Sequence, residues 1–276
     1  MSLTQATLAS DNTVYAQLDL DVGPENVRQT AYDMGITTEL DGIPAEGIGG
    51  LRLGVSPLEM ANAFATLASG GIRNTPVAIE RVEFPDGDVD EPQEEKRERV
   101  FSDGVAFTVT DILQQNILGG TGTAANIGCD AAGKTGTTDD FNDAWFVGYT
   151  PHLATSVWVG YPEALRSMTS VHGVAVAGGT FPAQIWGDYM EVAIGGDCPS
   201  FPTEPQNPVD FQPFTGKYAS EGLDAYQAEQ EAAAAEAQAA AEAEAKAQKK
   251  GDAGYDPGAY APGIQDPPER PAPDGD

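Results

Sequence analysis

A lysine set among hydroxyl side chains is the feature of this sequence best suited to chemistry. Residues 132–138 read Ala-Gly-Lys-Thr-Gly-Thr-Thr. If this segment is a strand, Thr135 and Thr137 lie on one face because side chains alternate, and Gly136 between them lets another backbone approach closely. The pattern predicts a ledge for a peptide carboxylate, with Lys134 as its cation. An ordinary polar edge strand, in which Lys and Thr are common, is the alternative.

A second candidate motif, Ser10-Asp11-Asn12, lies just before a predicted helix. By itself a Ser-x-Asn triplet is more often a helix cap than a site. Together, Ser-Asp-Asn and Lys-Thr-Gly form the motif pair of penicillin-binding proteins and class A β-lactamases, where they accompany a nucleophilic serine. The pair therefore indicates serine acyl-transfer chemistry.

Longer blocks of the sequence carry a resemblance to one family. The chain resembles the C-terminal part of the transpeptidase domain of class A penicillin-binding proteins, the bifunctional peptidoglycan synthases, of actinobacterial type. The blocks that carry this resemblance stand in family order within residues 3–195, and they are residues 10–18, 55–61, 120–124, 134–138, 143–151 and 178–183.

The resemblance implies a mechanism and roles for named residues. A serine in a Ser-x-x-Lys motif is acylated by the D-Ala-D-Ala end of a stem peptide, and an amine of a neighbouring stem then takes the acyl group. Ser10 would relay protons with Lys134, while Asn12 would hold the substrate amide and orient the motif lysine. Thr135 and Thr137 would bind the terminal carboxylate, or the equivalent group of a β-lactam.

The same resemblance implies the surroundings of the site. Gly136 would lie in the substrate-binding strand, and the backbone N–H of Thr137 would be one of two oxyanion donors. No cofactor is expected. The partners would be stem peptides ending in D-Ala-D-Ala, β-lactams and other cell-wall synthesis proteins. The site would face outward from the cell membrane, anchored by a segment absent from this chain.

The nucleophile of such an enzyme is missing from the sequence. None of its serines is followed three residues later by lysine. We therefore expect an N-terminally truncated domain that is inactive alone, and a parent protein that adds the Ser-x-x-Lys motif, a glycosyltransferase domain and a membrane anchor. The alternatives are a D-Ala-D-Ala carboxypeptidase or β-lactamase-like enzyme, and a non-catalytic scaffold with the penicillin-binding fold.

Periodicity and capping residues predict the elements that position these motifs. They indicate an α/β (α+β) fold in which helices flank an antiparallel sheet, and residues 91–99 are expected to form a solvated loop. Helices are predicted at residues 12–36 with a break at Gly23-Pro24, from Ser56 to Gly70, from Ser102 to Gly119 and at 180–194; strands are predicted at 77–84, 131–138, 143–149 and 153–160.

Composition divides the chain into three parts. Residues 1–215 are the predicted transpeptidase domain. Residues 216–250 are rich in Ala and Glu with almost no large apolar residue, which predicts a helical extension. Residues 251–276 are rich in Pro, Gly and Asp, which predicts a disordered tail.

The charge of the chain excludes several classes of partner. With 43 Asp and Glu against 14 Lys and Arg, the net charge is −29, so a nucleic-acid binder or a binder of anionic membrane surfaces is not expected. In residues 1–216 only Lys96 and Lys134 are lysines. Acidic surroundings are expected to raise the pKa of Lys134. His152 and His172 have no clustered ligands nearby, so no metal site is expected.

Cysteine usage is low, with only Cys129 and Cys198. Composition alone leaves two readings open, a pair of buried thiols or one long-range disulfide. The extracytoplasmic setting that the resemblance implies favours the Cys129–Cys198 disulfide.

Overall fold

A computed structural model describes residues 1–91, 96–210, 216–218, 235 and 238–239. The chain divides into two compact units, Met1–Ala219 and Ser220–Asp276. The predicted helical extension and disordered tail lie almost wholly outside the described residues and stay predictions. Within the described part, no helix has the length and apolar character needed to cross a membrane.

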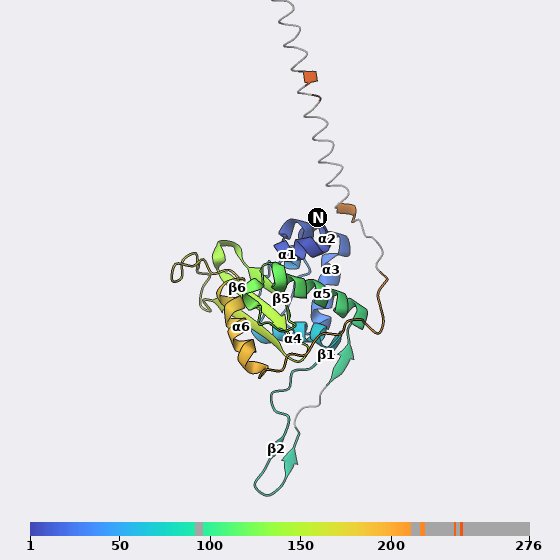
Figure 1. Ribbon diagram of the computed structural model, residues 1–276, viewed down its shortest axis with the longest axis vertical. Helices are drawn as coiled ribbons and strands as arrows, with labels where there is room; N and C mark the ends of the chain where they lie inside the picture. The colour runs from blue at the N-terminus through green and yellow to red at the C-terminus, as the bar shows by residue number, and fades with distance from the viewer. Residues whose placement is uncertain (92–95, 211–215, 219–234, 236–237, 240–276) are drawn as a thin grey trace, which may run out of the picture. The chain divides into compact units, whose positions relative to one another are not determined.

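Short helices build the N-terminal part of the first unit (Figure 1). Three of them, α1 (Leu3–Ala9), α2 (Asn12–Val22) and α3 (Pro24–Asp33), precede a 3-10 turn at Glu46–Ile48 and helix α4 (Pro57–Ala68). The predicted break at Gly23-Pro24 separates α2 from α3, and Ser56 caps α4 together with Glu59. Helix α1 was not expected.

Three antiparallel strands form the central sheet, as the sequence predicts. Strands β5 (Ala132–Thr137), β6 (Asp143–Tyr149) and β7 (Ala154–Gly160) are ordered β5-β6-β7. Lys134 lies opposite Val147, and Thr137 lies opposite Ala144. Strand β5 therefore forms one edge of the sheet.

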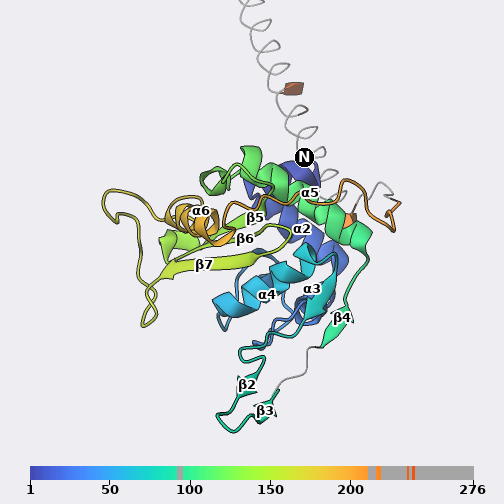
Figure 2. The same cartoon turned by 60° about the horizontal axis from the view of Figure 1, so that its bottom comes forward.

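Helices cover both faces of this sheet (Figure 2). On one face Phe146 packs against Trp186 of α6 (Phe181–Ala193), with ring centroids 5.3 Å apart. On the other face Tyr149 packs against Phe64 of α4, with centroids 6.2 Å apart. Helix α5 (Asp103–Gly119), capped by Ser102, runs along β5. The edge that carries Lys134 is thus held by α5 and backed by two apolar layers.

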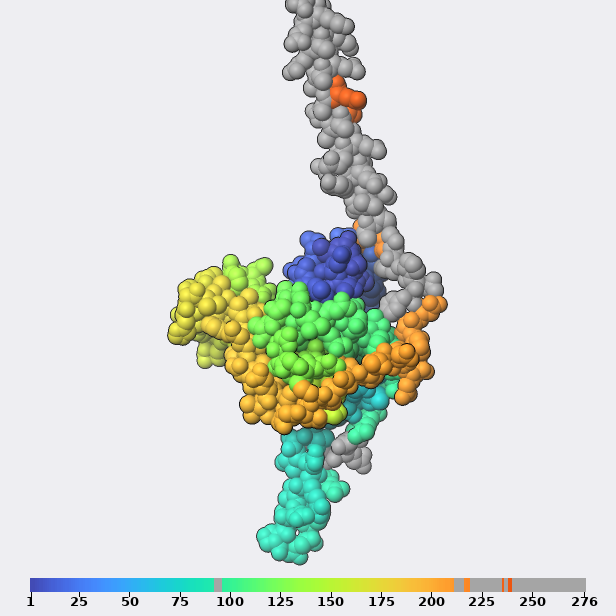
Figure 3. Space-filling model, in the orientation of Figure 1, coloured from blue at the N-terminus to red at the C-terminus, as the bar shows by residue number. Residues whose placement is uncertain are grey.

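Residues between α4 and α5 correct two predictions. The strand expected at 77–84 shortens to β2 (Val82–Glu83), which pairs with β3 (Val89–Asp90). The expected loop at 91–99 contains β4 (Arg97–Arg99), which pairs with β1 (Ile72–Asn74). The segment that carries β2 and β3 projects from the rest of its unit, in cyan to teal in Figure 3. Its apolar residues Ile79, Phe84 and Val89 are exposed, so backbone pairing, and not burial of an apolar face, joins β2 to β3.

A disulfide joins Cys129 to Cys198, with Cα atoms 5.3 Å apart. This is the pairing that the resemblance favours. Cys129 precedes β5 and Cys198 follows α6, so the covalent loop encloses the whole central sheet.

A buried carboxylate in α2 leads to a stability prediction. Asp19 is 4% exposed, and neither carboxylate oxygen has a hydrogen-bond partner among the described residues. Burial, and then the charge of Glu46, raise its pKa. Because a charge buried without a partner is costly, Asp19→Asn is expected to raise the free energy of unfolding at pH 7 by about 1 kcal/mol.

The pH dependence checks this cause. A carboxyl whose pKa is raised on folding stabilises the protein below its unfolded pKa of about 4, and that stability is lost as pH rises through the folded pKa. Urea unfolding should therefore show that Asp19→Asn gains more stability relative to the wild type at pH 7 than at pH 4. Asp188→Asn, at an exposed position of α6, is the matched control. Equal pH slopes in all three proteins would contradict the assignment.

Candidate active site

The bend between α1 and α2 presents Ser10. Its backbone is left-handed, with φ 54° and ψ 48°, a conformation that is uncommon outside glycine. The next residue, Asp11, caps α2 by accepting hydrogen bonds from the N–H groups of Thr13 and Val14. The helix cap predicted for this triplet is therefore Asp11, which leaves the exposed Ser10 hydroxyl available for another partner.

That partner is Lys134. Its Nζ donates to Ser10 Oγ at 2.7 Å and to the backbone oxygen of Thr135 at 2.9 Å. The structure thus joins the two motifs, which stand 124 residues apart in the sequence. A hydroxyl and an amine at this distance can exchange a proton.

Burial lowers the pKa of Lys134 to about 8. This is opposite to the rise expected from acidic surroundings. No carboxylate of the described residues forms an ion pair with Lys134, so the cost of placing a charge in a poorly solvated site dominates. A pKa near neutrality suits a residue that both gives and takes protons.

Asn12 lies in the first turn of α2, two residues after Ser10, and is exposed. Within the described part of the chain its side chain has no hydrogen bond. Its predicted contact with a substrate amide stays a prediction.

The two threonines share a face of β5, as predicted, but their hydroxyls already have partners. Thr135 is 8% exposed, and its Oγ1 lies 2.6 Å from Thr121 Oγ1. Thr137 is exposed and accepts a hydrogen bond from the N–H of Gly178 at 2.9 Å. The ledge is therefore built with help from two segments that the sequence analysis did not assign to the site.

Glycines mark these two segments. At Gly178 an added Cβ would lie 2.3 Å from the backbone oxygen of Trp145 and 2.5 Å from that of Gly136. Only glycine lets the chain approach the strand this closely. In the sequence, the glycine pairs 119–120 and 178–179 could have indicated that these segments approach the strand closely. They are ambiguous because glycine pairs also occur at the ends of helices.

The edge of β5 that does not pair with β6 offers a backbone donor near Thr137. The N–H of Thr138 donates to the oxygen of Asp143 at 3.0 Å. Since backbone groups alternate in direction along an antiparallel edge strand, the N–H of Thr137 points away from β6. This is the orientation that an oxyanion donor requires.

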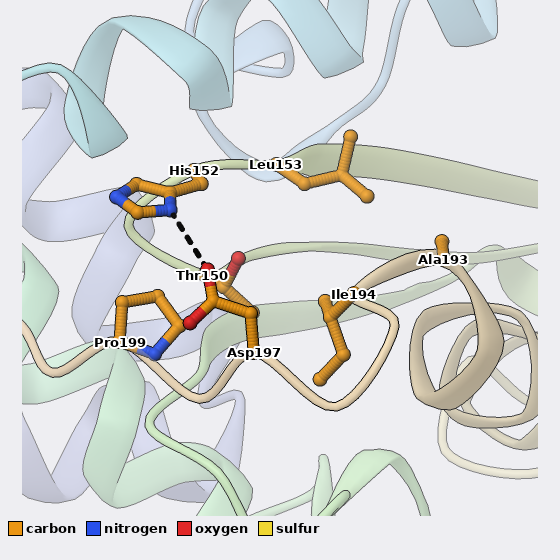
Figure 4. Close-up of a pocket in the computed structure, with 7 residues that line it drawn as sticks. All are labelled: Thr150, His152, Leu153, Ala193, Ile194, Asp197 and Pro199. Atoms are coloured by element: carbon orange, nitrogen blue, oxygen red, sulfur yellow. Dashed lines mark ion pairs between the residues drawn. The ribbon is translucent and has the colours of Figure 1, made fainter.

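A separate hollow lies at the other end of the strands (Figure 4). It has a volume of about 280 Å³, and in it His152 Nδ1 lies 3.6 Å from Asp197 Oδ2. It contains none of the predicted site residues. Its lining consists of Thr150, His152, Leu153, Ala193, Ile194, Asp197 and Pro199. No cluster of metal-ligating side chains occurs among the described residues.

Comparisons with known proteins agree with this arrangement. Residues 1–164 match the family described as the penicillin binding protein transpeptidase domain. Over 226 residues the chain is 35% identical to Penicillin-binding protein 1A of Mycolicibacterium smegmatis, an alignment that covers 73% of this chain and 28% of that relative. The chain therefore spans only about a quarter of this relative's length.

Two solved structures of PonA1, a penicillin-binding protein from Mycobacterium tuberculosis, are similar to the fold. The first has a TM-score of 0.66 at 29% identity and covers 77% of this chain and 63% of that one. The second, a complex with penicillin V, has a TM-score of 0.62 at 29% identity and covers 78% and 61%. By its residues 1–164, its motifs and its fold, the chain belongs to the transpeptidase-domain family of class A penicillin-binding proteins.

Proposed function

We propose that this chain supplies the proton relay and the substrate-binding strand of a peptidoglycan cross-linking transpeptidase. The observation that carries the proposal is the 2.7 Å contact between Lys134 Nζ and Ser10 Oγ. It places an exposed hydroxyl, a lysine of lowered pKa and the free edge of a strand together. The acylated serine comes from a Ser-x-x-Lys motif outside this chain.

The relay has a defined proton balance. When the serine attacks the D-Ala-D-Ala carbonyl, the lysine of its own Ser-x-x-Lys motif takes the hydroxyl proton, a C–O bond forms and the C–N bond to the terminal D-Ala breaks. Ser10 gives its proton to the leaving nitrogen, and the Lys134 ammonium replaces it. When the acceptor amine attacks the acyl-enzyme, a C–N bond forms and the C–O bond to the serine breaks. The amine proton returns through Ser10 to Lys134, and the motif lysine returns its proton to the serine. With a pKa of about 8, Lys134 can both donate a proton to Ser10 and accept one from it near neutral pH.

The strand edge binds the substrate. The N–H of Thr137 donates to the developing oxyanion, a contribution of about 3 kcal/mol for a donor of this kind. Thr137 and the charge of Lys134 attract the terminal carboxylate of the stem peptide. PonA1 has been solved with penicillin V, which supports the proposal that β-lactams bind this edge.

The wider setting is also part of the proposal. The parent protein adds a membrane anchor and a peptidoglycan glycosyltransferase, and this domain acts on the outer side of the cell membrane beside other cell-wall synthesis proteins. The class A relatives support this setting, because the chain matches 28% of the length of one of them.

Covalent labelling tests the function. The purified chain is expected to form no adduct with fluorescent penicillin, because it has no Ser-x-x-Lys serine. A chimera that places the Ser-x-x-Lys segment of the M. smegmatis relative before this chain is expected to form an adduct that survives denaturation. The measurement is fluorescence on a denaturing gel.

Two results would contradict the proposal. One is a denaturation-resistant band from the chain alone. The other is a folded chimera, verified by cooperative unfolding, that gives no band. Replacing the serine of the Ser-x-x-Lys segment by alanine is the matched control and should remove the band.

A further inference from the structure

The hollow between the β6–β7 turn and the end of α6 contains a buried hydroxyl without a partner. Thr150 lines this hollow and is 1% exposed, and its Oγ1 has no hydrogen-bond partner among the described residues. Thr150 follows β6 directly, and its N–H donates to the oxygen of Leu153 at 2.9 Å, so the strand pattern continues through it. Side chains alternate along a strand, which places Thr150 on the same face as Phe146, the face that α6 covers. The hollow therefore has a hydrogen-bonding group that the described part of the chain does not use.

Apolar side chains form another wall of the hollow. Leu153 and Ile194 are partly buried and pack against the core between the sheet and α6. In Figure 4 they lie to the right of the polar side chains of Thr150, His152 and Asp197. The volume of about 280 Å³ is roughly that of nine water molecules in the liquid. This arrangement suits a ligand with a polar head and a short apolar stem.

A turn after α6 brings Asp197 to the hollow. Gly195 and Gly196 have φ values of 60° and 83°, a left-handed conformation that glycine adopts without strain. The N–H of Asp197 donates to the oxygen of Ile194 at 2.9 Å, and the next residue, Cys198, forms the disulfide. The backbone of Asp197 is therefore held on both sides.

The charges around the hollow favour a cation. His152 Nδ1 lies 3.6 Å from Asp197 Oδ2, which is beyond hydrogen-bond distance, so the carboxylate keeps its acceptor sites for a ligand. The C-terminal end of α6 carries the negative end of the helix dipole, and no basic residue in its last turn balances it. Residues 135–216 contain nine Asp and Glu but a single Lys or Arg, Arg166, which does not line the hollow. An anion is therefore disfavoured here.

We propose that this hollow binds a primary ammonium group on a short apolar stem. Asp197 pairs with the charge, the Thr150 hydroxyl accepts a hydrogen bond, and the apolar wall packs against the stem. An ammonium has three N–H donors and no acceptor, which matches a carboxylate and a hydroxyl without partners. The group belongs either to a free amine or to the side chain of a diamino acid such as lysine. This site is independent of the proposed function, because it contains none of the residues of the relay or the ledge.

Methyl NMR of the full chain tests the proposal. In a chain with ¹³C-labelled Ile and Leu methyl groups, the Ile194 and Leu153 signals are assigned with Ile194→Val and Leu153→Met. They are then followed as n-butylammonium chloride is added at neutral pH and constant ionic strength. Saturable shifts with a dissociation constant of about 1 mM are expected for a ligand of this size.

Sodium butanoate is the control ligand, because it has a similar length and the opposite charge. It should cause no saturable shift. The proposal would be overturned by an absence of saturable shifts with n-butylammonium up to about 50 mM, or by an equal affinity for butanoate.

A second probe distinguishes the two sources of the ammonium group. Nα-acetyl-lysine N-methylamide carries the same four-carbon stem and head on a capped amino acid. Binding as tight as that of n-butylammonium would assign the hollow to a side chain of a larger molecule. Binding of n-butylammonium alone would assign it to a free amine. Both results support an ammonium site.

Asp197→Asn tests the ion pair. It is expected to weaken n-butylammonium binding by about fivefold or more, since it removes the charge and keeps the shape of the side chain. Asp188→Asn is the matched control, because it removes a charge from an exposed position of α6 that does not line the hollow. The affinity of this control should stay unchanged. Equal losses in the two variants would refute the pairing with Asp197.

Thr150→Val separates a contact with the ligand from a structural role. Valine has a similar shape and removes a hydroxyl that has no partner, so the unliganded chain should be at least as stable to urea. Binding of n-butylammonium should nevertheless weaken by about threefold or more. A Thr150→Val chain that loses stability, or that binds as tightly as the wild type, would contradict the role of Thr150.

Discussion

Lys134→Ala is expected to slow penicillin adduct formation in the chimera by about 100- to 10,000-fold, the range that a positioned acid or base contributes. Lys134 donates to Ser10 at 2.7 Å, and within the described residues no other side chain forms a hydrogen bond with the Ser10 hydroxyl. Without Lys134, Ser10 cannot be reprotonated after it gives its proton to the leaving nitrogen. The second-order rate constant of adduct formation is the measurement.

Lys96→Ala is the control for this loss. Lys96 is the other lysine of residues 1–216, and it is exposed just before β4. Its removal lowers the positive charge by the same amount but leaves Ser10 untouched, so the rate should stay near that of the parent. Equal losses in the two variants would show that net charge, and not the relay, is what matters.

The pH profile of the parent chimera gives a second check. Burial lowers the pKa of Lys134 to about 8, and the relay needs its ammonium form. Acylation is therefore expected to fall as pH rises through about 8, since the lysine loses its proton there. Unfolding is not the cause expected for Lys134→Ala, because a lysine whose pKa is lowered by burial costs stability at neutral pH.

Local signals were enough to predict the elements around the site. Ser56 with Pro57 marks the start of α4, Ser102 marks the start of α5, and the apolar run of β6 matches a strand packed on both faces. Helix α1 was missed because it has only seven residues, and its capping box at Ser2 and Gln5 has no long apolar stripe behind it. Short helices of this kind depend on tertiary contacts.

Contacts between segments far apart in the sequence could not be predicted from local sequence patterns. Arg97–Arg99 is exposed and charged, which is typical of a loop, yet it pairs with Ile72–Asn74 as β4 with β1. In the site, the Ser10 to Lys134 contact could be anticipated only from family resemblance, since it joins distant segments. The roles of Thr121 and Gly178 depend on where the loops close, and no local pattern specifies that.

The predicted rise of the Lys134 pKa was wrong for a related reason. The chain is strongly acidic, but net charge says little about the immediate surroundings of one side chain. Carboxylates on a solvated surface are screened over about 8 Å at physiological salt. At Lys134 the loss of solvation acts locally, and it exceeds the effect of distant charges.

Reduction of the Cys129–Cys198 disulfide is expected to lower the free energy of unfolding by about 4 kcal/mol, because the bond closes a loop of 69 residues and restricts the unfolded chain. A typical domain has only about 5–15 kcal/mol of net stability, so this is a large share. Urea unfolding with and without reductant is the measurement, after a thiol assay shows no free thiol in the native chain and two after reduction in denaturant.

The position of the disulfide indicates which part of the unfolded chain it restricts. The loop contains β5, β6, β7 and α6, while Ser10, α4 and α5 lie outside it. The double variant Cys129→Ser with Cys198→Ser should unfold at the same urea concentration as the reduced wild type and should not respond to reductant. An equal midpoint for oxidised and reduced wild type would contradict the prediction. Because the relay contact joins Lys134 to Ser10 and neither residue forms a hydrogen bond with the disulfide within the described part of the chain, reduction should lower the free energy of unfolding without breaking any direct contact of the relay.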